Sequence, residues 1–221
     1  MYPGSIPGEA SKIYFLNLII RIVCNITRLS VLYSQLIPDK RLSVCMVTFK
    51  RLCGLPAYGE MAISFPKPGS FREGVVFEFT MSGGNSWVGN FDPGYRTSSV
   101  ATGVYPELGA GAVFVLADGR AYKINAVTKE LIEEISRYVV WIGYFAPLEI
   151  MVVCDDLEVV AYTRAGVFWR SERVSWDGIE YVSIRNDRLF GQAYDPMDDR
   201  WLPFEIDLAT GLITGGSYLA N

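Results

Sequence analysis

The sequence contains no histidine. Zinc sites built on imidazole, serine or cysteine nucleophiles activated by histidine, and histidine general bases are therefore excluded. Acid–base hydrolysis can still use a pair of carboxylates alone. The absence leaves few of the common enzyme mechanisms open.

Cysteine is scarce, and its spacing matches no metal or redox motif. The four cysteines are Cys24, Cys45, Cys53 and Cys154, and no two of them form a C-x-x-C pair, so neither a zinc knuckle nor a thioredoxin-like pair is present. Cys154 ends the apolar run IMVVC, where we expect a buried, inert thiol. This usage favours a reducing, cytoplasmic location, and we expect no cofactor.

Positive charge is scarce after residue 60. Residues 1–60 contain seven Lys/Arg and three Asp/Glu, whereas residues 61–221 contain thirteen and twenty-one. An acidic body repels a phosphate backbone and offers little counterion release. We therefore expect no nucleic-acid partner.

Apolar residues and turn formers are abundant by contrast. Half of the residues are hydrophobic and 14% are aromatic, with 21 glycines and 11 prolines, which is typical of a globular chain with many turns. In the last quarter, apolar stretches alternate with turn-forming pairs. These pairs are Asp177-Gly178, Asn186-Asp187, Asp195-Pro196 and Thr210-Gly211. The pattern predicts antiparallel strands joined by tight turns, and hence an all-β fold.

The middle of the chain predicts further strands from its alternation of apolar and polar residues. They span residues 75–80, 86–91, 112–117, 120–125 and 128–135. Between the third and the fourth lies Asp118-Gly119, a pair typical of a two-residue hairpin turn because both positions need a positive φ. We interpret residues 128–135 as a strand with one exposed face.

From residue 138 onward the strands fall into two groups of four. The first group is 138–144, 149–154, 157–162 and 167–170, and the second is 180–184, 188–194, 201–207 and 212–214. Corresponding strands lie about forty residues apart, the spacing of a four-stranded repeat. The sequence therefore predicts antiparallel meanders in four-stranded units.

Two stretches resemble a known family of repeats. Gly111–Ile135 and Phe204–Gly215 are similar to the repeats of quinoprotein-like and WD-type β-propellers, and Asp207-Leu208-Ala209-Thr210-Gly211 matches the D-x-x-T-G turn of such blades. The likeness covers roughly residues 74–216 and about three and a half units, whereas closed propellers use four to eight blades. It implies a small or partial propeller, with a β-sandwich or a meander barrel as the alternatives.

A second resemblance involves the C-terminal pattern. W-D-G at residues 176–178, followed by W-x-P-F-x-x-D-x-x-x-G at residues 201–211, resembles the corresponding part of a group of bacterial proteins. This likeness implies a bacterial protein and brings no particular activity with it.

Residues 1–60 differ from the rest, and we assign them to an N-terminal extension of an all-β domain at 61–221. Between residues 13 and 37 an apolar run is interrupted by Asn17, Arg21, Asn25, Arg28 and Gln35, which line up as one polar stripe on a helix. Two arginines make a spanning helix unfavourable, since each costs about 2.5–3.5 kcal/mol at the bilayer centre.

Three interpretations of this extension stay open. It is a helix packed on the β domain, or a basic amphipathic helix on a membrane surface, or an upstream segment that precedes a natural start at Met61. Membrane contact is expected only through residues 13–37.

The aromatic residues supply the first candidate site. The five tryptophans are Trp87, Trp141, Trp169, Trp176 and Trp201. In strands they pack in the core first, but an exposed Trp/Arg patch has the composition of protein–protein hot spots. Trp176 and Asp177, with Arg173 before them and Arg200 and Trp201 further on, are the candidate binding residues.

The acidic residues supply two further candidates. Asp195, Asp198 and Asp199, with Asp92 elsewhere, are a candidate metal site, although they lack the EF-hand spacing. A carboxylate pair for hydrolysis would be drawn from Asp155, Asp156, Asp177, Asp187 and Glu205. Turn aspartates are common in β-rich chains for structural reasons.

These observations give three hypotheses about function. The first is a non-catalytic protein-interaction module that binds a protein partner through the loops around Trp176 and Asp195. The second is a carboxylate- or metal-dependent hydrolase, and the third is a membrane-associated structural protein held by residues 13–37.

Overall fold

The computed structural model describes residues 47–69, 72–95, 101–109 and 111–218. The prediction of an all-β fold is confirmed, because these residues form sixteen strands and a single short 3-10 turn, Ala146–Leu148. The helix expected between residues 13 and 37 lies outside the described residues.

The sixteen strands form four sheets of four, and the prediction of four-stranded units is confirmed. Sheet A contains β1 (Val47–Leu52), β2 (Ile63–Phe65), β3 (Val75–Met81) and β4 (Ser86–Phe91), and sheet B contains β5 (Gly103–Tyr105), β6 (Ala112–Ala117), β7 (Arg120–Asn125) and β8 (Glu130–Ser136). Sheet C contains β9 (Trp141–Phe145), β10 (Ile150–Cys154), β11 (Val159–Thr163) and β12 (Gly166–Arg170), and sheet D contains β13 (Ile179–Arg185), β14 (Arg188–Asp195), β15 (Arg200–Asp207) and β16 (Ile213–Gly215).

Sheets B, C and D are antiparallel meanders whose strands follow chain order. The two predicted groups of four strands correspond to sheets C and D. The hairpin predicted at Asp118-Gly119 joins β6 to β7, and both residues have the positive φ that such a turn needs, 45° and 90°. Local turn chemistry therefore sets the register of these strands.

Sheet A is not a meander. It is nevertheless a complete fourth unit, whereas the sequence indicated about three and a half units. Its order is β1-β3-β4-β2, and β2 pairs with β4 in parallel. Strand β1 pairs with β3 over six residues, although it lies within the segment 1–60 that we assigned to the extension. The strand β1 was not predicted, because it follows an apolar segment and its pairing partner lies more than twenty residues further on.

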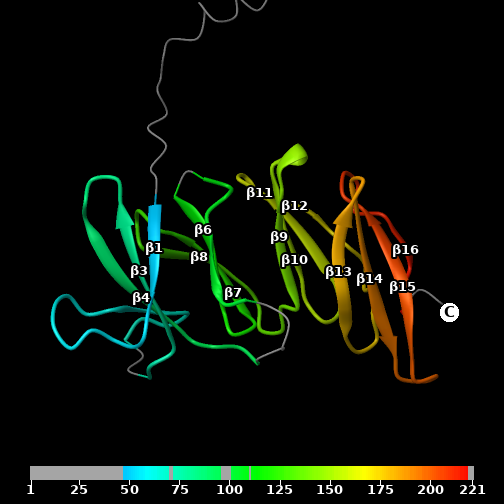
Figure 1. Ribbon diagram of the computed structural model, residues 1–221, viewed down its shortest axis with the longest axis horizontal. Helices are drawn as coiled ribbons and strands as arrows, with labels where there is room; N and C mark the ends of the chain where they lie inside the picture. Colours follow the sequence, from blue (N-terminus) through cyan, green and yellow to red (C-terminus); the bar gives the residue numbers. More distant parts are fainter. Residues whose placement is uncertain (1–46, 70–71, 96–100, 110, 219–221) are drawn as a thin grey trace, which may run out of the picture. The chain divides into compact units, whose positions relative to one another are not determined.

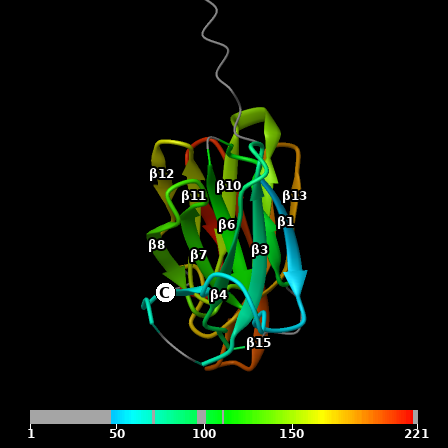
Figure 2. The ribbon, with the colours of Figure 1, turned by 90° about the vertical axis from the view of Figure 1, so that its left-hand side faces the viewer.

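The four sheets pack face to face in chain order (Figure 1). One buried cluster joins sheets A and B through residues such as Phe79, Trp87 and Tyr122. A second joins sheets B and C, and a third joins C and D. Figure 2 presents the sheet A end of this stack. Sheets B and C each pack against a neighbouring sheet on both faces, whereas sheets A and D each have one neighbouring sheet.

The two halves of the stack, sheets A and B and sheets C and D, contain equivalent contacts at positions 82 residues apart. Trp87 in β4 donates its indole N–H to the carbonyl of Ala126 (2.9 Å), and Trp169 in β12 donates to the carbonyl of Leu208 (2.8 Å). The two tryptophans lie 82 positions apart, and so do their acceptors. The indole therefore links sheet C to sheet D in the same way as it links sheet A to sheet B.

The turns that carry these acceptors are equivalent as well. The side-chain oxygen of Asn125 accepts hydrogen bonds from the amides of Val127 and Thr128. Asp207, 82 residues later, accepts from the amides of Ala209 and Thr210 and from the Thr210 hydroxyl, and these bonds, the hydroxyl's first, lower its pKa. The D-x-x-T-G turn thus serves to place a backbone carbonyl under a tryptophan.

The interface between sheets B and C is of a different kind. Tyr162 of β11 packs edge-on against Phe114 of β6, with ring centroids 5.3 Å apart. Its hydroxyl donates to a carboxylate oxygen of Glu133 at 3.3 Å, and the Lys123 ammonium lies 5.5 Å from the tyrosine ring centroid. Burial raises the pKa of Tyr162 and lowers that of Lys123. The ring of Tyr162 therefore joins the half made of sheets A and B to the half made of sheets C and D.

We predict that Trp169→Phe destabilises the protein by about 2–3 kcal/mol, because it removes a buried hydrogen bond and leaves the Leu208 carbonyl without its donor. Trp87→Phe should cost a similar amount. Trp201→Phe, at a ring that is 38% exposed, is the control and should cost much less. Urea unfolding measures the three differences, and equal stability of wild type and Trp169→Phe would contradict the role of the bond.

We predict that Gly211→Ala costs about 1–3 kcal/mol. Gly211 has φ +75°, and an added Cβ would lie 2.9–3.1 Å from atoms of the Trp169 ring. Gly83→Ala is a matched control, because a Cβ there would meet no heavy atom within 4 Å, and we expect it to change stability by less than about 0.5 kcal/mol. Thermal unfolding of both variants checks the difference.

Candidate functional site

An arginine and two aromatic rings meet on the segment between β12 and β13. The guanidinium carbon of Arg173 lies 5.5 Å from the ring centroid of Trp176 and 5.0 Å from that of Tyr218, and the two rings are 4.6 Å apart. Arg173 also donates to the carbonyls of Ser175 and Trp176, each at 2.8 Å. The backbone therefore fixes the guanidinium against both rings.

A second aromatic pair lies beside this group. Tyr194 of β14 and Trp201 of β15 are opposite each other in the register, with ring centroids 5.1 Å apart. Trp201 reaches Gly178, whose ideal Cβ would be 3.6 Å from the indole, so it meets the turn that carries Trp176. We call Arg173, Trp176, Tyr194, Trp201 and Tyr218 the aromatic rim.

The rim unites three of the five predicted binding residues, Arg173, Trp176 and Trp201. Trp176, Trp201 and Tyr218 are each 38% exposed, so each ring is held on one side and available on the other. Asp177 is exposed on the turn itself. Arg200 pairs with Asp198 at 2.8 Å, and its side chain is 55% exposed.

Sequence reasoning missed Tyr194 and Tyr218. Tyr218 follows Gly215-Gly216, beyond the last strand, where no local pattern indicates a contact. Its neighbour Ser217 explains the placement, because the Ser217 hydroxyl accepts from the amide of Trp176 and donates to the carbonyl of Tyr194. A serine 41 residues away thus fastens the Trp176 turn to sheet D.

The other tryptophans belong to the core. Trp87 and Trp169 are buried at 5% and 9% exposure and make the hydrogen bonds between sheets described above. Trp141 packs against the cluster between sheets C and D. The tryptophans are thus divided between packing and the rim.

The aspartates of the acidic loop between β14 and β15 have separate partners. Asp195 is buried and accepts from the amide of Met197 at 3.0 Å, Asp198 pairs with Arg200, and Asp199 accepts from the Tyr194 hydroxyl at 2.6 Å. Asp92 lies elsewhere, 3.8 Å from the Arg120 guanidinium. Across residues 47–218, apart from the gaps noted above, no group of three or more Cys, Asp or Glu is placed to hold a metal ion.

The candidate carboxylates for hydrolysis have mainly structural partners. Asp155 accepts from the amides of Leu157 and Glu158, and Glu205 pairs with Arg188. Asp187 lies exposed in the turn after β13 with φ +61°.

The pKa of the Asp156 carboxyl is raised. Burial is the largest cause, followed by repulsion from the neighbouring charge of Asp155; Asp177 adds to the rise, and Arg173 opposes it. The Asp156 carbonyl accepts from the amide of Gly178. Its carboxyl group therefore belongs to the electrostatic surroundings of the rim.

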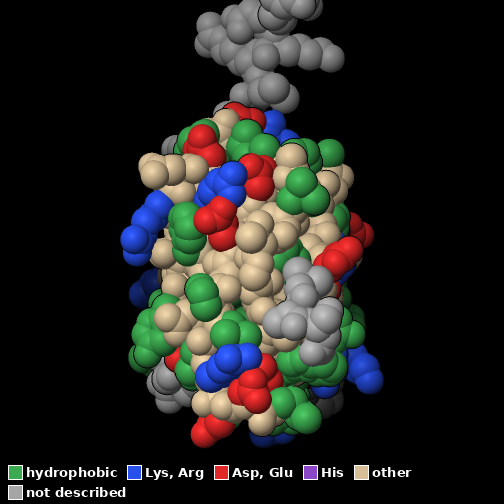
Figure 3. Space-filling view, turned by 90° about the vertical axis from the view of Figure 1, so that its right-hand side faces the viewer, with side chains coloured by type: hydrophobic (Ala, Val, Ile, Leu, Met, Phe, Trp, Pro, Cys, Tyr) green, Lys and Arg blue, Asp and Glu red, His purple; other side chains and the backbone are tan. Residues whose placement is uncertain are grey.

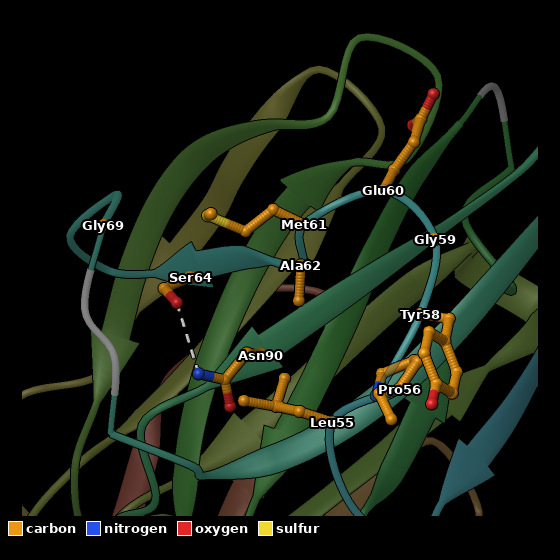
Figure 4. A pocket seen from close by; sticks show the side chains of 11 residues that line it. Leu55, Pro56, Tyr58, Gly59, Glu60, Met61, Ala62, Ser64, Gly69 and Asn90 are labelled. Carbon is orange, nitrogen blue, oxygen red and sulfur yellow. Dashed lines mark hydrogen bonds between the residues drawn. The ribbon is translucent and has the colours of Figure 1, made fainter.

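A cavity of about 280 Å³ lies beside sheet A, lined by residues that include Leu55, Tyr58 and Met61 (Figure 4). At its polar side Asn90 donates to the Ser64 hydroxyl and to the Arg72 carbonyl, and its oxygen accepts from the amide of Gly74. Because both the amide group and the oxygen of Asn90 are engaged, this polar side serves to fasten the segment that covers sheet A.

A comparison with models of protein families finds none that matches the chain, and a comparison with curated proteins finds no similar sequence. Within the described ranges, no helix has both the length and the apolar character needed to span a bilayer.

We predict that Asp156→Asn stabilises the protein at neutral pH. Because the folded-state pKa of Asp156 is raised above its ordinary value of 3.8, its charged form is less stable in the folded protein than in the unfolded chain. The gain should shrink as pH falls through the folded-state pKa and vanish near about pH 3, where the carboxyl is protonated in both states. Urea unfolding between about pH 3 and 7 tests this, and a variant less stable than wild type at neutral pH would contradict it.

Proposed function

We propose that the protein is a non-catalytic protein-interaction module of β-propeller-like type, which binds a partner protein through the aromatic rim. The observation that carries the proposal is the meeting of Arg173, Trp176 and Tyr218 with Tyr194 and Trp201. Trp, Tyr and Arg are the residue types most enriched among binding hot spots. We also propose a bacterial, cytoplasmic protein.

The rim is preorganised for binding. Arg173 is held by two backbone carbonyls, and the Trp176 turn is held by Ser217 and by the Ser175 hydroxyl, which donates to the Gly178 carbonyl at 2.6 Å. Rings fixed before binding lose little conformational entropy when a partner covers them. Their exposed faces are therefore suited to bind a partner.

The stacking of four sheets in chain order supports the propeller-like part of the proposal. Such an arrangement is built from repeated units. The rim lies on the segment between sheets C and D, at the hairpin between β14 and β15, and just after β16. Loops on a rigid β scaffold are where binding residues concentrate.

We predict that Trp176→Ala weakens partner binding at least about tenfold, the loss typical of a hot-spot aromatic. The experiment is affinity capture from the native host with the wild type, Trp176→Ala and Trp201→Ala, followed by titration of the captured protein. Phe168→Ala is the matched control, because Phe168 is an exposed aromatic on β12 outside the rim.

A partner retained by Phe168→Ala and lost by both tryptophan variants supports the proposal. A partner that binds all four proteins equally would overturn the assignment of the rim. Circular dichroism of each variant confirms that the sheets remain folded.

A further inference from the structure

The outer face of sheet D is the counterpart of a face that is covered elsewhere in this chain. The equivalent contacts described above make sheet D the counterpart of sheet B, since Asp207 in sheet D corresponds to Asn125 in sheet B and each begins the same turn. In sheet B this face packs on sheet C. In sheet D it is the end of the stack and faces the viewer in Figure 3.

The register identifies the equivalent side chains. Across sheet B one row of neighbouring residues on this face runs Tyr105, Phe114, Lys123 and Glu133. Across sheet D the corresponding row runs Ser183, Phe190, Glu205 and Thr214. Phe190 therefore occupies the position of Phe114.

Phe114 has a partner that Phe190 lacks within the described chain. The ring of Tyr162 packs edge-on against Phe114, and its hydroxyl reaches Glu133. On sheet D the surface beside Phe190 is hollowed instead, with a volume of about 380 Å³. The smaller Ser183 at the position of Tyr105 leaves room there for a ring.

The lining of this hollow matches one aromatic side chain with a polar tip. Phe190, Tyr181 and Pro203 supply apolar surface, and the polar side of the lining comes from Ser183, Arg185, Asn186 and Gln192. Tyr181 lies at a bulge of β13 with φ +53° and is 75% exposed. In the middle of the view in Figure 3, uncharged polar and hydrophobic atoms predominate, and charged side chains lie nearer its upper and lower ends.

We propose that the hollow beside Phe190 binds a tyrosine side chain of a partner protein, packed on Phe190 as Tyr162 packs on Phe114. This inference rests on the proposed function, because it requires a protein partner. The tyrosine hydroxyl would hydrogen-bond to the side-chain amide of Gln192, which lines the hollow. Phe190 and Tyr194 lie four residues apart on β14, hence on the same face of sheet D, so one partner can cover both the hollow and the rim.

A second copy of this chain is a poorer occupant. Its sheet A corresponds to sheet C, but Thr80 stands 82 residues before Tyr162, and Glu78 stands in the same relation to Val160. The face of sheet A that would approach sheet D therefore presents a threonine where the ring is needed.

The test uses 4-methylphenol, the side chain of tyrosine without its backbone, titrated into the full chain and followed by amide NMR shifts. We expect saturable shifts confined to β13, β14 and β15, with a dissociation constant on the order of a few millimolar. Toluene should bind several-fold more weakly because it lacks the hydroxyl, and cyclohexanol more weakly still because it lacks the ring.

Two variants separate binding in the hollow from binding elsewhere. Phe190→Ala should weaken 4-methylphenol roughly tenfold. Ser183→Tyr places a ring of the chain's own in the hollow, which should abolish the shifts in a protein that stays folded. Phe168→Ala, at an exposed ring on β12, should bind as the wild type does.

Shifts that persist in Ser183→Tyr, or that are equal for cyclohexanol and 4-methylphenol, would overturn the proposal. So would concentration-dependent dimerisation in sedimentation that Ser183→Tyr abolishes, because the occupant would then be a second copy. If the hollow does not bind 4-methylphenol but Trp176→Ala still loses the partner, the proposal for the aromatic rim remains valid. The two proposals can therefore be contradicted separately.

Discussion

The fold depends on the buried hydrogen bond between a tryptophan indole and a carbonyl of the next sheet. Trp169 reaches Leu208, and Trp87 reaches Ala126, across 39 residues in both cases. A buried carbonyl costs free energy unless it is paired, and an indole that donates nowhere does too. Each bond therefore fixes the separation and the angle of two sheets at once, and the turn that displays the carbonyl has to keep its shape.

This constraint explains which sequence signals were informative. The D-x-x-T-G turn and Asp118-Gly119 are local, since each is set by its own side chains and φ angles, and the strands that they join were predicted correctly. The tryptophans were identifiable only as a class. Nothing near Trp169 distinguishes it from Trp176, because burial is decided by a partner almost forty residues away.

Sheet A and the aromatic rim also contain contacts between distant residues that local sequence does not predict. Strand β1 is recognised as a strand only through its pairing with β3, and β2 is three residues long and parallel to β4. At the rim, Trp176 and Arg173 were within reach of sequence reasoning because they lie three residues apart. Tyr218 was not, since the contacts that tie the C-terminal segment to the Trp176 turn, such as that of the Ser217 hydroxyl, join residues about forty positions apart.

The outer faces of sheets A and D, at the two ends of the stack, differ in amino-acid composition. Between sheets B and C the contact face of sheet C presents Met151, Val153 and Tyr162, all buried. At the equivalent places sheet A has Thr48, Lys50 and Thr80, with Lys50 opposite Glu78 in the register, so this end is suited to water. Sheet D keeps a phenylalanine at the position of Phe114 and adds Tyr181, Tyr194 and Trp201 around it. Because burial of aromatic surface drives association whereas opposite charges in water contribute little, the outer face of sheet D is better suited to burial than that of sheet A.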